Sequence, residues 1–259
     1  MKGLKKHTRR DREKAVEEIL PLVRRKFGDN LVALAAQGSF ARGDDAAYSD
    51  LELIAFVKEM PGNEEWAGIG KIRDGLLVEL VWMTRETYLK RTPEVNKDWF
   101  LSGSDVLLPI INERFVRELT DYRVENLSEK CLAEAKLRWH EVQEATGKVL
   151  NATAAAKAAA EKSRDAIPLL FADMLIHMLI TLSFLNRTPY ITFARFIEQA
   201  RRFDTKPPSF ENLLDIMTNG EFEDLARLEK TVETVFSQFE AIFEAFGVEL
   251  YDDNINPDI

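Results

Sequence analysis

Gly38-Ser-Phe-Ala-Arg-Gly-Asp-Asp-Ala-Ala-Tyr-Ser-Asp-Leu-Glu52 is the stretch that decides the fold, because it joins two apolar segments that are predicted to be strands, 31–37 and 50–58. Glycine lets the backbone approach a ligand closely, and Ser39 offers a hydroxyl and an N–H at an expected helix start, where an anion is favoured. Side chains alternate along a strand, so Asp50 and Glu52 are predicted to share one face. Neighbouring carboxylates repel unless a cation joins them, and a divalent metal bound to phosphate oxygens is the usual partner. This segment predicts a phosphate-binding turn beside a metal site.

A plainer interpretation of the same stretch is a loop followed by an edge strand with a solvated acidic face. That interpretation accounts neither for the Gly-Ser pair nor for its spacing from the two acids. A third apolar segment, 76–83, carries one acid, Glu79, which is costly to bury without a partner. Glu79 either pairs with a neighbouring basic side chain or joins Asp50 and Glu52 as a third acid of the site.

The pattern of elements predicts an α/β half followed by a helical half. Helical spacing of apolar residues over 10–27 and strands at 31–37, 50–58 and 76–83 predict a small mixed sheet with flanking helices, while 60–70 is predicted to be a loop. From residue 127 onward the chain is predicted to be an all-α bundle. The domain boundary is placed between residues 126 and 127, giving domains 1–126 and 127–259.

The helical half contains further periodic segments. Helices are expected over 127–167, from about 168 to 185, and over 193–203, 210–218 and 221–246. In the last of these, Phe236, Phe239, Phe243 and Phe246 recur at helical spacing and are interpreted as core packing. The single cysteine, Cys131, is likewise expected to be a helix core residue, and it fits a reducing, cytoplasmic location.

Charge and hydropathy exclude several function classes. The chain has 35 basic and 44 acidic residues and a net charge of −9, without the basic stripe expected of a protein that binds a nucleic-acid polymer. An acidic surface would suit a small polycationic molecule. The segment 167–185 is interrupted by Asp173 and His177, so no membrane association is expected. The basic start of the chain leads into a charged helix, so no secretory signal is expected.

The spaced set Gly38-Ser39, a glycine-containing linker and Ser49-Asp50-Leu51-Glu52 resembles the signature of the nucleotidyltransferase superfamily. The α/β half followed by a helical half narrows this to one branch, and the chain is similar to the kanamycin nucleotidyltransferase family over nearly its whole length. The further residues that carry this resemblance are Arg42, Tyr48, Val78-Glu79, Glu144-Ala-Thr-Gly147-Lys148, Asn151, Tyr190-Ile191-Thr192 and, more loosely, Asn219-Gly220 to Tyr251.

The resemblance implies an enzyme of antibiotic resistance that transfers AMP from ATP to a hydroxyl of an aminoglycoside, uses Mg²⁺ and releases pyrophosphate. It implies that Asp50 and Glu52 bind the metal and that Glu144 is the general base. It further implies that the nucleotide is bound by Gly38, Ser39, Arg42, Lys148 and Thr192. The acceptor would be bound by Glu79 and Glu141. It also implies a homodimer in which each active site draws on both subunits. Phe184, Tyr190, Phe193 and Phe196 are then expected to be core or partly interface.

Alternatives remain open at several points. Glu144 could be a solvated helix residue, with His140, Glu141 and Lys148 forming surface pairs on neighbouring turns. Val149 and Leu150 depart from the more polar or aromatic residues of the family, and the acceptor could instead be a lincosamide or a protein hydroxyl. A non-catalytic homologue that serves as a binding partner is a third possibility, although such a module has no reason to keep two adjacent acids.

Overall fold

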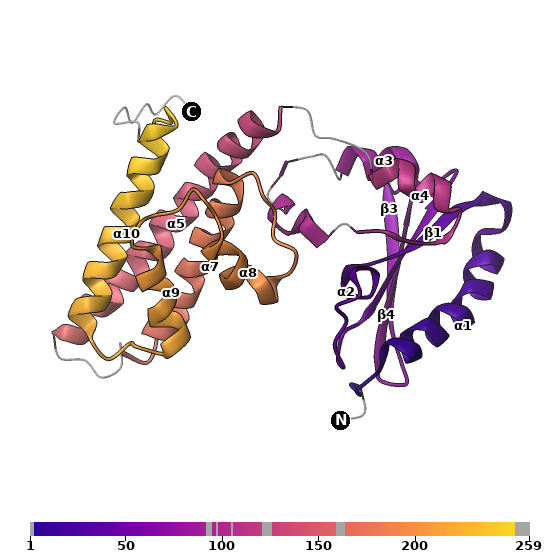
Figure 1. Ribbon diagram of the computed structural model, residues 1–259, viewed down its shortest axis with the longest axis horizontal. Helices are drawn as coiled ribbons and strands as arrows, with labels where there is room; N and C mark the ends of the chain where they lie inside the picture. Colours follow the sequence, from indigo (N-terminus) through magenta and orange to yellow (C-terminus); the bar gives the residue numbers. More distant parts are fainter. Residues whose placement is uncertain are drawn as a thin grey trace. The chain divides into compact units, whose positions relative to one another are not determined.

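The protein is described by a computed structural model that covers residues 3–91, 95–96, 98–104, 106–120, 126–158 and 164–251, with the backbone alone at 102–104. The chain forms two compact units (Figure 1). The first comprises Met1–Glu94 and Leu101–Glu125, and the second comprises Val95–Phe100 and Asn126–Ile259. The predicted boundary between 126 and 127 adjoins residues 121–125, which lie outside the described residues. The division into domains 1–126 and 127–259 therefore stays a prediction.

The first unit is built on a five-stranded mixed sheet in the order β3-β4-β2-β1-β5. Strands β2 and β4 run parallel, and every other neighbouring pair is antiparallel. The strands are β1 (Leu31–Gln37), β2 (Leu51–Val57), β3 (Trp66–Arg73), β4 (Leu76–Met83) and β5 (Leu108–Ile111). The predicted mixed sheet with flanking helices is therefore confirmed.

Two strands escaped the sequence analysis. Strand β3 begins inside the segment 60–70 that was predicted to be a loop, and that prediction was wrong for its second half. Nearly all of β3 is exposed at the sheet edge and it carries two glycines, so it lacks the apolar alternation of a half-buried strand. Strand β5 contains Pro109, a residue that sheets tolerate on an edge strand such as this one.

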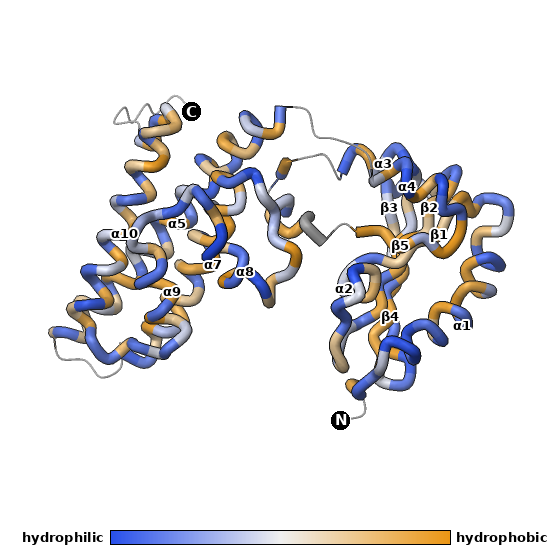
Figure 2. Tube along the Cα trace, viewed as in Figure 1, coloured by the Kyte–Doolittle hydropathy of each residue, from blue (hydrophilic) through white to orange (hydrophobic). Residues whose placement is uncertain are grey.

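Helix α1 (Arg9–Phe27) covers one face of the sheet. Its first turn is closed by a capping box in which Thr8 and Asp11 bond each other's backbone N–H, and its C-cap is Gly28 at φ 51°, where glycine is favoured. Its apolar side packs on the strand residues that point toward it, among them Leu51 and Leu53. Figure 2 shows hydrophilic and hydrophobic residues mixed along α1, as expected for a helix with one buried side.

The opposite face of the sheet is part core and part open surface. Helices α3 (Arg85–Arg91) and α4 (Glu113–Thr120) pack there against Ile54, Phe56 and Met83. Because side chains alternate, Glu52 lies on the same face as Ile54 and Phe56, two residues nearer the start of β2. The short helix α2 (Gly38–Arg42) follows β1 directly.

The second unit is helical, as predicted. Its elements are α5 (Leu127–Lys157), α7 (Ile167–Leu185), η3 (Phe193–Arg195), α8 (Phe196–Arg201), α9 (Phe210–Asn219) and α10 (Leu225–Ala245). Trp139 on α5 is buried against the rings of Phe239 and Phe243 on α10. Cys131 is fully buried, which raises the pKa of its thiol to about 12 and confirms its place in the core.

One aromatic prediction was wrong, and a second, which allowed either core or interface, differs from residue to residue. Phe246 follows the end of α10 and is exposed, so the predicted aromatic stripe stops at Phe243. Phe184, Tyr190 and Phe196 are buried within the unit, whereas Phe193 is 57% exposed. Of the four side chains considered for an interface, Phe193 alone offers a large free surface.

Helix α7 is long and apolar enough to cross a membrane by length and composition, so the statement that its polar residues exclude this was wrong. The core helix of a soluble protein passes the same test, and 61% of the apolar window of α7 is buried inside the protein. Its contacts include a stack of Phe184 on Trp99 and a hydrogen bond from the Tyr190 hydroxyl to the Leu179 carbonyl.

Candidate active site

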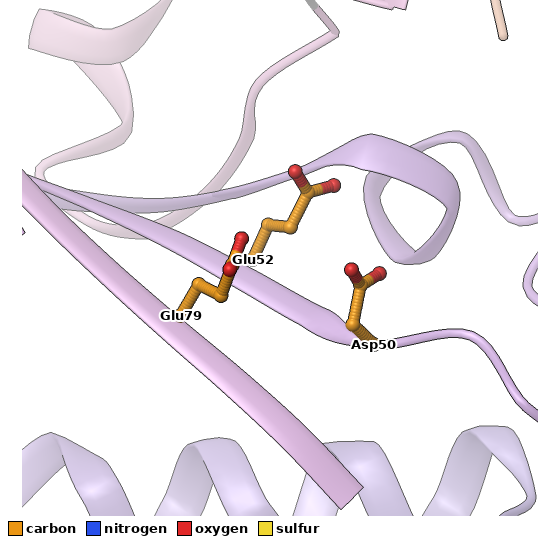
Figure 3. Close-up of side chains that lie close together, drawn as sticks. All are labelled: Asp50, Glu52 and Glu79. Atoms are coloured by element: carbon orange, nitrogen blue, oxygen red, sulfur yellow. The ribbon is translucent and has the colours of Figure 1, made fainter. Parts of the chain in front are cut away.

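Three carboxylates meet on the open part of the sheet (Figure 3). Asp50, Glu52 and Glu79 each place an oxygen within 4.8 Å of the others, and all three are half-buried. Glu52 and Glu79 are direct neighbours in the parallel β2–β4 pairing, and Asp50 lies just before β2. The structure therefore brings the two predicted metal ligands and the third acid together.

Two acids of this cluster, Asp50 and Glu79, lack a salt bridge to the residues that the structure describes. Among the described residues, no Lys or Arg forms an ion pair with Asp50 or Glu79, so the simple salt bridge considered for Glu79 is absent there. Close carboxylates of this kind repel, and a hard divalent cation with oxygen ligands is the partner that their chemistry fits. The donor set suits Mg²⁺, which is usually held by one or two protein carboxylates together with phosphate oxygens.

Gly38 is required by the position of Glu52. Its φ is +68°, and a Cβ built there would lie 1.7 Å from the Glu52 Oε2 atom. The residues Gln37 and Glu52 face each other across the β1–β2 pairing, which brings the end of β1 against the acid. Gly38 thus makes room for the Glu52 carboxylate.

Ser39 and Arg42 lie on α2, beside the acids. In the described part of the chain the Ser39 hydroxyl makes no hydrogen bond, and Gln37 does not cap the helix with its side chain. Unused donors at such a turn are suited to phosphate oxygens. Arg42 is mostly buried and its Nε lies 3.3 Å from a carboxylate oxygen of Asp44, so a phosphate would share this guanidinium with an acid.

A groove of about 840 Å³ adjoins the acids on the outer strands. Gly68 and Gly70 of β3 form its floor opposite Val81 and Glu79, because glycines leave the backbone uncovered. Glu64 and Glu65 line its rim, and Glu65 pairs with Lys90 at 3.2 Å. Sequence analysis missed these two acids because it treated their segment as a loop, and the doubled acid before Trp66 is the signal that could have found them.

The other predicted site residues lie in the helical unit, and all of them except Thr192 are on α5. Glu144 and Lys148 are one turn apart and form an exposed ion pair of 2.8 Å. The hydrogen bond from Lys148, together with its charge, lowers the pKa of Glu144, and Glu144 in turn raises the pKa of Lys148. The surface pair that was left open as an alternative is thus formed in this structure.

Glu141 is on the same side of α5 and lies between two basic partners. Arg138 approaches one of its oxygens at 2.6 Å, and His177 of α7 approaches the other at 3.4 Å. Thr192 lies in the same unit just before η3, where its carbonyl accepts the N–H of Arg195. Within the described ranges, no hydrogen bond or ion pair joins Thr192 to Glu141, Glu144 or Lys148.

Comparison with known proteins identifies the family. The model of the family described as KNTase C-terminal domain matches residues 116–249, which is more than half of the chain. The chain belongs to this family. The predicted resemblance to kanamycin nucleotidyltransferases is confirmed, and the chain is a nucleotidyltransferase.

Two curated relatives match this chain over both units. An aminoglycoside nucleotidyltransferase (4′) from Staphylococcus aureus and another from Bacillus sp. are each 23% identical over 246 residues, covering 93% of this chain and 93% of theirs. A putative protein adenylyltransferase from Methanocaldococcus jannaschii is 39% identical over 46 residues, 18% of this chain and 31% of its own. A solved nucleotidyltransferase-like protein from Exiguobacterium sibiricum is 13% identical, with a TM-score of 0.42, over 90% of this chain and 74% of its own.

Proposed function

We propose that this family member transfers AMP from ATP to a hydroxyl of an aminoglycoside, with Mg²⁺ as cofactor and pyrophosphate as the other product. The observation that carries the proposal is the cluster of Asp50, Glu52 and Glu79 beside the Gly38-Ser39 turn. The two aminoglycoside nucleotidyltransferases that match along nearly the whole chain support nucleotidyl transfer to an aminoglycoside. A cytoplasmic location, where ATP is plentiful and Cys131 stays reduced, is part of the proposal.

In this reaction the acceptor oxygen forms a new bond to the α-phosphorus of ATP, and the bond from that phosphorus to the bridging oxygen of pyrophosphate breaks. Asp50 and Glu52 would hold Mg²⁺, and Glu79 would contact the metal or the acceptor. Bound there, the metal would neutralise phosphate charge as it develops. Gly38, Ser39 and Arg42 would position the phosphates, which is the main contribution of the protein in phosphoryl-type transfer.

Glu144 is the proposed general base, which accepts the proton of the attacking hydroxyl at a carboxylate oxygen. Positioned bases of this kind contribute roughly 10²–10⁴ to the rate. Lys148 and Thr192 would add contacts to the nucleotide, and Glu141 a contact to the acceptor. As the family resemblance implies, we propose that these residues act in a homodimer, where one subunit supplies the acids and its partner supplies the base.

The acceptor class is inferred from charge. Glu64, Glu65 and Glu79 line the groove next to the acids, and acidic walls attract a small polycation such as an aminoglycoside. The flat glycine floor leaves room for a ring that lies against the backbone. The 46-residue match to a putative protein adenylyltransferase favours a protein hydroxyl as the second candidate acceptor.

A panel of acceptors tests the proposal. The protein is incubated with ATP labelled at the α-phosphate, with Mg²⁺ or with EDTA, and with aminoglycosides, lincosamides or the protein itself as acceptor. We expect label to enter aminoglycosides only, and only with Mg²⁺. Label in the protein would favour a protein hydroxyl as the acceptor, and label in lincosamides would favour that class of drug. No transfer to any acceptor with Mg²⁺ and ATP would contradict the proposed reaction.

A further inference from the structure

Arg12 is a fully buried arginine on the first turns of α1, with 0% of its side chain exposed. Its guanidinium donates from Nε and from one terminal nitrogen to the Ser49 carbonyl, at 3.1 and 2.6 Å. It also donates to the Ala46 carbonyl at 2.6 Å and to the Asp45 carboxylate at 3.1 Å. A buried charge with this many acceptors on one short loop fixes the path of that loop.

The loop that Arg12 holds leads directly into Asp50. Glu52 and Glu79 are fixed by the ladder between β2 and β4, which begins at the pairing of Leu51 with Val78. Asp50 precedes that ladder, so no strand pairing orients its backbone. The two-nitrogen contact of Arg12 with the Ser49 carbonyl instead fixes the peptide plane immediately before Asp50.

The same network reaches the helix that carries Ser39. The side chain of Asp45 is 3% exposed, and its carboxylate forms an ion pair with Arg12 through one oxygen and with Arg9 through the other. Arg9 also donates to the Phe40 carbonyl on α2 at 3.0 Å and lies over the Phe40 ring. The two arginines thus connect the metal-binding acid to the proposed phosphate-binding turn through Asp45.

We propose that Arg12 is a positioning residue that sets the direction of the Asp50 carboxylate toward the metal. The proposal rests on the proposed function, because it assumes that Asp50, Glu52 and Glu79 bind a divalent cation. Partners of this kind, which hold a ligand in place without touching the metal, typically change metal affinity 10–100-fold when they are replaced.

Binding of Mn²⁺ to the full chain, followed by electron paramagnetic resonance in the absence of nucleotide, tests this role. Arg12→Lys keeps the charge beside Asp45 but cannot contact the Ser49 carbonyl through two planar nitrogens. Val23→Ala removes core packing from the same helix without touching the loop and is the matched control for lost stability. Each is combined with Asp50→Asn to ask whether Arg12 acts through that acid.

We expect Arg12→Lys to weaken Mn²⁺ binding about 10-fold or more. Val23→Ala should leave the Mn²⁺ affinity within about twofold of the wild-type value. In the Asp50→Asn background, Arg12→Lys should cause no further loss of affinity. Equal losses in the two backgrounds, or equal losses for Arg12→Lys and Val23→Ala, would overturn the role of Arg12 while leaving the metal site intact. Mn²⁺ binding that Asp50→Asn does not weaken would refute the proposed metal site, and with it the role of Arg12.

A second variant covers the case in which Arg12→Lys does not fold. Asp45→Asn keeps the guanidinium and its contacts with Ser49, but removes the charged acceptor that holds it. We expect a smaller loss of Mn²⁺ affinity, about threefold or more, that again disappears in the Asp50→Asn background. An unchanged affinity in Asp45→Asn would then count against the proposal.

Discussion

The two groups of predicted site residues differ in how their charge is compensated. In the sheet unit, Asp50 and Glu79 are half-buried acids without an ion-pair partner among the residues that the structure describes. On α5, Glu144 is exposed and already paired with Lys148 at 2.8 Å. The charges of Asp50 and Glu79 are therefore suited to a cation, whereas the charge of Glu144 is already compensated by Lys148.

This difference decides how strongly the structure supports a functional role for each group. Repulsion between close acids persists only where something else in the protein or a ligand offsets it, so the sheet cluster is a functional signal in its own right. An exposed i,i+4 pair is common on any helix and contributes little to stability. The proposed role of Glu144 therefore rests on the family resemblance, whereas the proposed role of Asp50 is also supported by the geometry of the three acids.

The largest expected effects come from replacing Asp50 and Glu144, and Mn²⁺ affinity distinguishes the two variants. Asp50→Asn removes an ionic ligand without changing shape, and we expect transfer to fall by at least about 10³-fold and Mn²⁺ affinity to fall with it. Glu144→Gln should lower transfer by roughly 10²–10⁴ but leave Mn²⁺ affinity unchanged. Turnover and Mn²⁺ affinity are measured for both variants. Asp29→Asn, which changes an exposed acid, is the control.

Near wild-type turnover in Asp50→Asn would contradict the site assignment. Mixing the two inactive variants then tests the shared site. In a homodimer with exchange, both lesions collect in one site of each heterodimer and leave the other intact, so activity should recover to roughly a quarter of the wild-type value. No recovery despite demonstrated subunit exchange would rule out that each site draws on both subunits.

Two glycines provide the second test. Gly38→Ala would force a Cβ against Glu52 at a positive φ, and we expect transfer to fall about 10–100-fold with a loss of about 1–3 kcal/mol of stability. Gly147 lies inside α5, where a Cβ would meet nothing within 4 Å, so Gly147→Ala should stabilise the helix by about 0.5–1 kcal/mol.

Thermal unfolding and turnover of both alanine variants give the comparison. If Gly147→Ala retained its stability but lost transfer, a second subunit or a substrate would have to approach α5 at Gly147. If Gly38→Ala kept full activity, Glu52 could not need its present position.

The smallest expected effect concerns the ion pair on α5. Lys148 lowers the pKa of Glu144, so Lys148→Met should raise that pKa toward its ordinary value. A base works when deprotonated, and activity is lost as the pH falls through its pKa. The acidic limb of kcat/KM should therefore move to higher pH in Lys148→Met. Lys157 is also on α5 and pairs with Glu229 of α10, so Lys157→Met is the matched control and should leave the acidic limb in place. An acidic limb that stays put in both variants would argue against Glu144 as the base.

Much of the fold could be predicted from the sequence, because buried strands and helices have clear periodicity. The bounds of β1 and β4 follow directly from apolar runs. Strand β3 could not be found this way, since an exposed edge strand shows no apolar alternation. The parallel pairing of β2 with β4 is a long-range choice that no local pattern specifies, although it decides that Glu52 meets Glu79.

The candidate site shows the same division. The spacing of Gly38, Asp50 and Glu52 is local in sequence, so the proximity of the two acids could be predicted, and the structure confirms it. The burial of Arg12 could not be predicted, because an arginine among charged residues at the start of a helix is usually exposed. Its burial depends on a loop more than thirty residues away, and only the structure brings the two together.

Cys131 gives the helical unit a built-in reporter. It is the only cysteine of the sequence, it is fully buried, and its raised pKa keeps the thiol protonated at neutral pH. A thiol reagent can therefore modify the chain only during excursions that expose α5. The rate of that modification, read by mass spectrometry, counts the opening events of one unit without an engineered label, and it would show whether a variant in the sheet unit disturbs the helices at all.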